Sequence, residues 1–105
     1  KTTIDVVVNN YKEHPEQVNQ ELNKVWTITF NDIVSTTSVT NDTIYVLNGK
    51  GEEVAVKYSV DKMKVKVQPV KNYTSGETYT LWVKDVKSTT GKTIGKYETL
   101  KFTIK

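Results

Sequence analysis

The 105-residue sequence contains no cysteine. Disulfide bonds, thiolate metal sites and a cysteine nucleophile are therefore excluded. A domain of this length buries roughly two-thirds of the surface that its unfolded chain exposes, which is enough for an ordinary apolar core. No apolar run approaches the roughly 20 residues of a membrane span, and Lys1-Thr2-Thr3 does not open a signal peptide. We expect residues 1–105 to form one domain, without membrane insertion, whose targeting elements lie elsewhere.

Arginine is also absent: all 15 basic residues are lysine, and with 12 acidic residues the net charge is +3. Nucleic-acid readers use arginine for forked contacts to guanine and phosphate, so this absence argues against specific nucleic-acid recognition. Alanine occurs once, at Ala55, whereas valine and threonine are abundant. That composition is typical of β-strands.

Residues that could carry catalysis are scarce. His14 is the one histidine, which excludes a multi-histidine metal site and leaves no partner set for a serine-histidine-acid triad. It precedes Pro15 in a polar stretch, where we expect a solvated loop residue. Glu52 and Glu53 are adjacent in a hairpin and so point to opposite faces, which makes them poor partners for glycoside hydrolysis. The sequence predicts no catalytic residue, no cofactor and no enzymatic activity.

Strict alternation of apolar and polar residues recurs along the chain and marks strands with one buried and one exposed face. It occurs in Lys24 to Phe30, Val54 to Val60, Met63 to Val67, Tyr79 to Val83 and Leu100 to Ile104, with shorter runs at Ile4 to Val8 and Ile44 to Leu47. Met63 falls on the apolar side of its run. The sequence thus predicts about seven strands and a core formed by Trp26, Ile28, Phe30, Val65, Val67, Tyr79, Leu81, Phe102 and Ile104.

The connections between these runs predict tight turns. Asn48 to Gly51 carries an Asn-Gly signal for a hairpin in which both central residues adopt positive φ. Ser59 to Lys62 predicts a second hairpin, and Ser88 to Gly95 a long turn before the last strand. Only Pro15 to Leu22 favours helix, as one short turn. The pattern as a whole indicates an antiparallel, all-β sandwich.

Tyr79 gives the most specific indication of topology. It lies just after the turn Tyr73 to Gly76, near the start of the penultimate strand, on that strand's apolar side. In Greek-key sandwiches a tyrosine at this position buries its ring and directs its hydroxyl to backbone a few residues upstream. We therefore expect the Tyr79 hydroxyl to bond backbone between residues 73 and 76.

Four motifs stand out by their order and spacing: Trp26-Thr-Ile-Thr-Phe30-Asn31-Asp32, Val65-Lys-Val67-Gln-Pro69, Tyr73-Thr-Ser-Gly76-Glu-Thr-Tyr79 and Phe102-Thr-Ile104. Together they resemble the Big_5 or SbsA-type family of bacterial Ig-like domains found in S-layer and other cell-surface proteins. The resemblance covers roughly residues 24–105, and whether Ile4 to Val8 is the first strand or the tail of a preceding module is left open, as is the place of residues 1–23.

The resemblance implies an antiparallel Ig-like (Greek-key) β-sandwich of about seven strands. It also implies a non-catalytic spacer module of a multidomain protein at the bacterial cell surface or cell wall, outside the cell. The implied partners are neighbouring domains of the same chain, and we expect the isolated domain to be monomeric. The alternative function is a module that binds cell-wall polymer or glycan, accessory to a wall-associated enzyme or acting in adhesion.

A structural cation is the first candidate site. Asp32 follows a strand end and could share a cation with Asp85 or Asp42, but calcium takes six to eight oxygens and the chain has no dense acidic cluster. Relatives often read Asp-x-x-Gly-Asn after the penultimate strand, where Lys87 to Lys92 stands here. We therefore predict no metal, and expect Asn31 and Asp32 to bond local backbone.

A binding face is the second candidate site. Lys57, Lys64 and Lys66 should lie on the outer side of one hairpin, either attracting an anionic wall polymer or discouraging edge-to-edge pairing of strands. Trp82 points away from the apolar side of its strand and should be at least partly exposed. It could stack on a sugar, dock a neighbouring domain, or cover the stem of a lysine such as Lys101.

Overall fold

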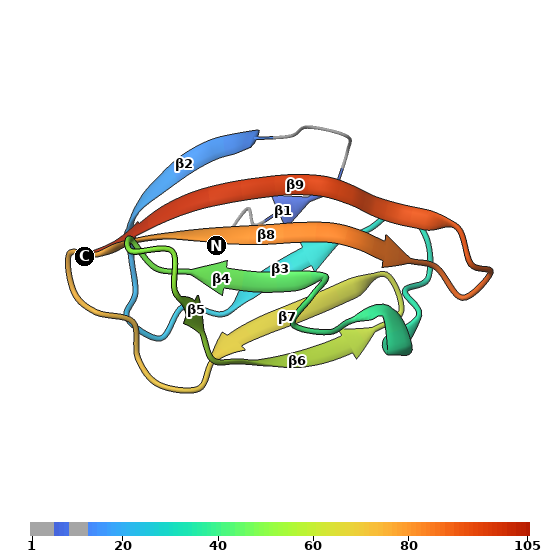
Figure 1. The fold of residues 1–105 in the computed structure, drawn as a ribbon, viewed down its shortest axis with the longest axis horizontal. Helices are drawn as coiled ribbons and strands as arrows, with labels where there is room; N and C mark the ends of the chain where they lie inside the picture. Colours follow the sequence, from blue (N-terminus) through green and yellow to red (C-terminus); the bar gives the residue numbers. More distant parts are fainter. Residues whose placement is uncertain (1–5, 9–12) are drawn as a thin grey trace, which may run out of the picture.

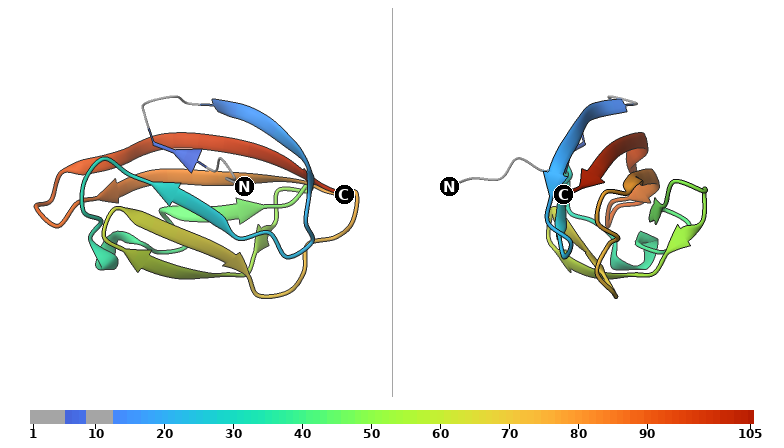
Figure 2. Two further views of the ribbon diagram at one scale, coloured as in Figure 1. Left: turned by 180° about the vertical axis from the view of Figure 1, so that it is seen from behind. Right: turned by 90° about the vertical axis from the view of Figure 1, so that its left-hand side faces the viewer.

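The structure is a computed structural model that describes residues 6–8 and 13–105. Two β-sheets pack face to face around one core, as the ribbon shows from three directions (Figures 1 and 2). The described residues form no helix of membrane-spanning length and hydrophobicity. In chain order the elements are β1 (Val6–Val7), β2 (Glu13–Gln20), β3 (Trp26–Thr29), the 3-10 turn η1 (Thr36–Ser38), β4 (Ile44–Leu47), β5 (Glu53–Val54), β6 (Val56–Asp61), β7 (Lys64–Pro69), β8 (Thr78–Lys87) and β9 (Thr93–Ile104).

The two sheets have the strand orders β1-β3-β7-β6 and β2-β9-β8-β4-β5. Neighbours within each sheet are antiparallel except at one edge of each, where β1 pairs parallel to β3 and β2 pairs parallel to β9. Strands far apart in sequence therefore lie side by side, as expected of a Greek-key arrangement. The predicted all-β, Ig-like sandwich is confirmed, and the described residues form two more strands than the seven expected, namely β2 and β5.

One predicted strand is in fact two. The run Val54 to Val60 divides at Ala55, because β5 pairs with β4 in one sheet whereas β6 pairs with β7 in the other. Alternation alone does not reveal this division, since the residues on both sides of Ala55 keep the same apolar period. The chain here crosses from one layer to the other.

The predicted helical turn at Pro15 to Leu22 is wrong, because most of this segment belongs to strand β2, which ends at Gln20. Its backbone pairs with β9 in irregular register, and Asn19 adopts a positive φ of 57°. Partners on the last strand of the chain override a weak local preference. The predicted first strand, Ile4 to Val8, falls partly outside the described residues; within them, β1 covers Val6–Val7.

The two hairpins form where predicted, with differences in detail. In the first, the positive φ occurs at Gly51 rather than at Asn48 and Gly49, and the Asn48 side chain accepts the backbone N–H of Lys50 at 2.9 Å. In the second, Lys62 adopts a φ of 56°. Met63 lies in that turn and is 45% exposed, so its predicted place on the buried face is wrong.

All nine predicted core residues are buried. Phe102 lies at the centre, with its ring centroid 4.9 Å from that of Trp26 and 5.6 Å from that of Tyr79. Because β3 and β9 belong to different sheets, these aromatic contacts join the two layers. Further buried apolar residues are Val8, Val34, Ile44, Val46, Tyr73, Val83, Val86 and Leu100.

The tyrosine corner is present. The Tyr79 hydroxyl accepts a hydrogen bond from the backbone N–H of Thr74 at 2.8 Å, within the stretch that the sequence predicts. The ring of Tyr73 packs against that of Tyr79 at 4.7 Å between centroids. Burial raises the pKa of Tyr73 well above its ordinary value, and its buried hydroxyl has no hydrogen-bond partner among the described residues.

These neighbouring tyrosines should respond differently to loss of the hydroxyl. Tyr79→Phe leaves the Thr74 N–H without its acceptor, so we expect a loss of about 1–2 kcal/mol in the free energy of unfolding. Tyr73→Phe removes an unpaired buried hydroxyl and should leave stability unchanged or slightly higher. Urea denaturation of both variants checks this, and equal losses would contradict the assigned hydrogen bond.

Gly95 lies inside a strand rather than in the predicted long turn. β9 begins at Thr93, so the turn covers only residues 88–92, where the Ser88 N–H bonds the Lys92 carbonyl at 2.7 Å. Gly95 is buried between the sheets. A Cβ atom there would lie 2.7 Å from Cε2 of Phe30 and 3.0 Å from Cγ1 of Val83. Only glycine fits this close approach.

Gly95→Ala should therefore destabilise the domain through overpacking, by about 2 kcal/mol. Gly49→Ala is the matched control, because its Cβ would meet nothing closer than 3.7 Å and its backbone has no positive φ. Thermal unfolding should separate the two variants by several degrees. Equal unfolding midpoint temperatures for the two variants would contradict this, because they would show that the core around Phe30 accommodates an added methyl group.

Candidate functional site

A row of side chains crosses the outer face of the five-stranded sheet. Glu13 on β2 lies opposite Thr99 on β9, Thr99 lies opposite Trp82 on β8, and Trp82 lies opposite Tyr45 on β4. All four belong to the outward positions of their strands, because the neighbouring Leu81, Val83 and Leu100 are buried in the core. Four segments of the chain are thus needed to build one surface.

Aromatic rings occupy one side of this row. The indole of Trp82 stacks nearly parallel to the ring of Tyr45, at 5.9 Å between centroids and 7° between planes. The ring of Tyr97 meets the indole edge-on at 5.5 Å and 62°. Trp82 is half-buried, and these contacts come from tyrosines rather than from a lysine stem. Among the described residues the buried Trp82 N–H finds no acceptor.

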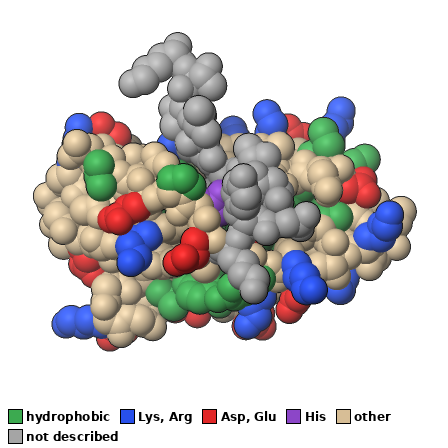
Figure 3. Space-filling model, turned by 90° about the horizontal axis from the view of Figure 1, so that it is seen from above, with side chains coloured by type: hydrophobic (Ala, Val, Ile, Leu, Met, Phe, Trp, Pro, Cys, Tyr) green, Lys and Arg blue, Asp and Glu red, His purple; other side chains and the backbone are tan. Residues whose placement is uncertain are grey.

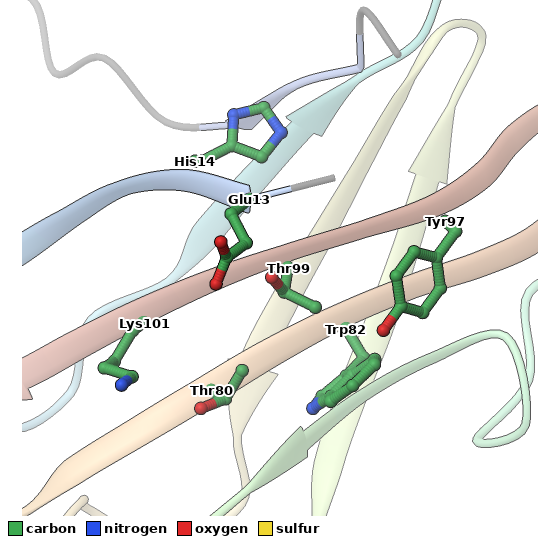
Figure 4. Close-up of a pocket in the computed structure, with 7 residues that line it drawn as sticks. All are labelled: Glu13, His14, Thr80, Trp82, Tyr97, Thr99 and Lys101. Carbon is green, nitrogen blue, oxygen red and sulfur yellow. The ribbon is translucent and has the colours of Figure 1, made fainter. Parts of the chain in front are cut away.

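Beside the indole is a shallow hollow of about 370 Å³. Figure 4 shows Glu13, Thr80, Trp82, Tyr97, Thr99 and Lys101 around it, with His14 behind β2 and β9. The floor is formed by threonine, one wall is aromatic, and the rim carries one acid and one lysine. We call this feature the Trp82 hollow.

His14 is not the solvated loop residue that the sequence predicts. It lies in β2 opposite Leu100, on the inner face, with its side chain only 9% exposed. Its Nε2 is 2.5 Å from Oε1 of Glu98, whose side chain is 2% exposed. Sequence reasoning missed Glu98, although its place two residues before Leu100 in an alternating strand marks it as inward-facing. The contact between His14 and Glu98 links the edge strand β2 to β9, the last strand of the chain.

The predicted lysine face lies on the other side of the molecule. Lys57, Lys64 and Lys66 are exposed on the outer face of the four-stranded sheet, opposite to the face that carries Trp82. Trp82 and these lysines are predicted from the sequence to form one binding face, but they lie on opposite faces of the molecule and do not form one surface. None of the three has an acidic partner within ion-pair distance in the described part of the chain.

The acidic residues considered for a cation are separated. Asp42 and Asp85 line one depression together with Glu53, whereas Asp32 lies in another beside Lys92 and Lys96. The Asp32 carboxylate accepts the backbone N–H of Ile33 at 2.7 Å, which confirms its expected local bond. Across residues 6–8 and 13–105, no group of three or more histidine, cysteine, aspartate or glutamate side chains is arranged to hold a metal ion.

Comparison with known proteins agrees with this architecture. No curated protein matches the chain. Among solved structures, the N-terminal part of the bacterial S-layer protein SbsC is similar in fold, with a TM-score of 0.62 and 20% sequence identity. The similar region covers 88% of this chain but only 23% of the SbsC chain. The sequence also matches the Big_5 bacterial Ig-like domain over residues 2–104, so the chain belongs to the Big_5 family of bacterial Ig-like domains.

Proposed function

We propose that this domain is a non-catalytic spacer module of a multidomain protein at the bacterial cell surface. The observation that carries the proposal is the parallel pairing of β2 with β9. Family membership and the similarity in fold to part of an S-layer protein support the location outside the cell. The role requires a body that keeps its shape under load rather than a reactive site.

The β2–β9 pair has the geometry that resists pulling. Because the strands run in the same direction, a force applied at the start of β2 and the end of β9 acts along the strands. The inter-strand hydrogen bonds then carry the load together instead of breaking one at a time. The end of β9 is fastened as well: the Lys105 N–H bonds the Gln20 carbonyl at 3.0 Å, and Lys105 Nζ lies 2.8 Å from Glu21.

A side chain also ties the two layers together away from the core. The Tyr58 hydroxyl, on β6 of one sheet, donates to the carbonyl of Ile44, on β4 of the other. Burial, with smaller contributions from the Glu53 and Asp42 carboxylates, raises the pKa of Tyr58 to about 12. The hydroxyl therefore stays protonated, and able to donate, throughout the physiological range.

The spacer role is tested in the protein that carries this domain. Deleting the domain should bring the segments on either side of it closer together, whereas replacing it with an unrelated Ig-like sandwich of equal length should restore their separation. Distances between labels in the flanking domains, measured on the cell surface, give the readout. If the replacement fails to restore function while spacing is normal, the domain acts through its surface and the spacer role is wrong.

A second candidate function is attachment to an anionic wall polymer through Lys57, Lys64 and Lys66. The observation that favours it is their exposure on one sheet without acidic partners among the described residues. The fraction of the domain that sediments with purified cell walls should then fall as the salt concentration rises. It should also fall when all three lysines are replaced by glutamine, but not for Lys92→Gln. Lys57, which lies on the edge strand β6, would otherwise serve to prevent pairing at that edge.

A further inference from the structure

We propose that the Trp82 hollow binds the ring of a neutral sugar. This inference is independent of the spacer role, because it concerns the outer face of the five-stranded sheet and not the load-bearing pair. It differs from the anionic polymer considered above in both the face used and the charge of the ligand.

The aromatic wall is held in place by two tyrosines, and part of the indole lines the hollow. Tyr45 stacks on the side of the indole that is turned toward β4. On the side turned toward β9 the residue directly opposite is Thr99, and the ring of Tyr97 meets the indole edge-on at 5.5 Å between centroids. A threonine side chain is too small to cover an indole, and the hollow occupies the space above it. An exposed indole face can pack against the C–H face of a pyranose ring.

The rim supplies groups that bind hydroxyls. Thr80 and Lys101 pair across β8 and β9 on one side of the hollow, and Tyr97 stands on the other. Glu13 lies on the side of the hollow opposite to Trp82. Its strand, β2, is two strands away from β8, so the backbones of Glu13 and Trp82 are about 10 Å apart. Hydroxyl, carboxylate and ammonium groups around one aromatic wall match a polyhydroxylated ring, which needs both donors and acceptors.

The charge of the hollow favours a neutral ligand. Among its lining residues Glu13 and Lys101 have opposite signs, and His14 reaches it only from behind and is paired with Glu98. On the face above β2 and β9, Figure 3 shows basic and acidic side chains interspersed rather than a patch of one sign. An anionic polymer would gain little here, so binding should depend weakly on salt.

The test uses the two tryptophans as internal reporters. The indole N–H signals of Trp82 and Trp26 are followed by NMR in the domain with isotope-labelled tryptophan. Cellotriose and triacetylchitotriose, each added up to about 10 mM, should shift the Trp82 signal and leave the signal of the core residue Trp26 in place. Raising the salt concentration tenfold should change the apparent Kd by less than about twofold.

Matched variants locate the effect. Trp82→Ala should weaken binding at least tenfold, Lys101→Ala severalfold, and Lys66→Ala, on the opposite face, not at all. Lys101→Ala alters only an exposed side chain, so it remains informative if Trp82→Ala unfolds the domain. The proposal is overturned if neither sugar shifts the Trp82 signal, if both indole signals shift together, or if the signal moves only when a neighbouring domain is joined to the chain.

Discussion

Phe102→Ala is expected to lower the free energy of unfolding by about 3–5 kcal/mol, because truncating a fully buried ring loses its transfer energy and leaves a cavity. Phe102 is 0% exposed, and its ring contacts those of Trp26, Tyr73 and Tyr79, at 4.9, 5.3 and 5.6 Å between centroids. Since these rings come from both layers, the cavity would open at the junction of the sheets. A loss of this size is a large fraction of the 5–15 kcal/mol that typical domains possess.

Urea denaturation followed by tryptophan fluorescence measures this loss, with Trp26 as the reporter beside the cavity. Tyr97→Ala is the control: the same strand loses an aromatic ring, but one that is 42% exposed. We expect the control to lose less than about 1 kcal/mol. Similar losses for the two variants would show that Phe102 is not the centre of the core.

His14→Ala is the second change with a large expected effect. The substitution removes the imidazole whose Nε2 lies 2.5 Å from Oε1 of Glu98, and Glu98 is only 1% exposed. Removing one partner of a buried hydrogen-bonded pair typically costs about 1–3 kcal/mol, because the remaining buried polar group loses one of its contacts. We also expect the loss to appear as weaker hydrogen-exchange protection in β9 along its β2 side, since β2 is an edge strand held partly by this pair.

The double variant His14→Leu with Glu98→Leu separates the pair from its surroundings. Replacing both side chains with apolar residues leaves neither polar group buried without the other, so the double variant should be more stable than His14→Ala. Unfolding free energies of the wild type, His14→Leu, Glu98→Leu and the double variant, measured under the same conditions, give the coupling between the two side chains. Additive losses in this cycle would mean that the two residues do not act as a pair.

The sequence predicts the core well because alternation along a strand reports which face is buried. Trp26, Tyr79 and Phe102 lie inside as expected, and Tyr79 bonds the predicted stretch of backbone. Alternation does not report pairing between distant strands. The segment from Pro15 to Gln20 is strand rather than helix because it pairs with β9, which lies more than seventy residues later in the chain.

The same limit applies to the candidate site. The outward direction of Trp82 follows from its strand, whereas the alignment of Glu13, Thr99 and Tyr45 with it depends on the register of four strands. The predicted solvent exposure of His14 is wrong for a related reason. A polar residue in a polar segment is expected to be solvated unless its buried partner on another strand is known. Charge partners across a sheet cannot be inferred from spacing along the chain.

The load-bearing role of the parallel β2–β9 pair is tested most directly by pulling a single domain in two directions. Because the chain has no cysteine, introduced cysteines provide unique handles. Handles at Glu13 and Lys105 shear β2 against β9, whereas handles at Ser75 and Lys105 peel apart strand ends that lie side by side, where the Gly76 N–H bonds the Ile104 carbonyl at 3.0 Å. We predict a several-fold higher rupture force for the first pair of handles. An equal or lower force in that direction would contradict the spacer role.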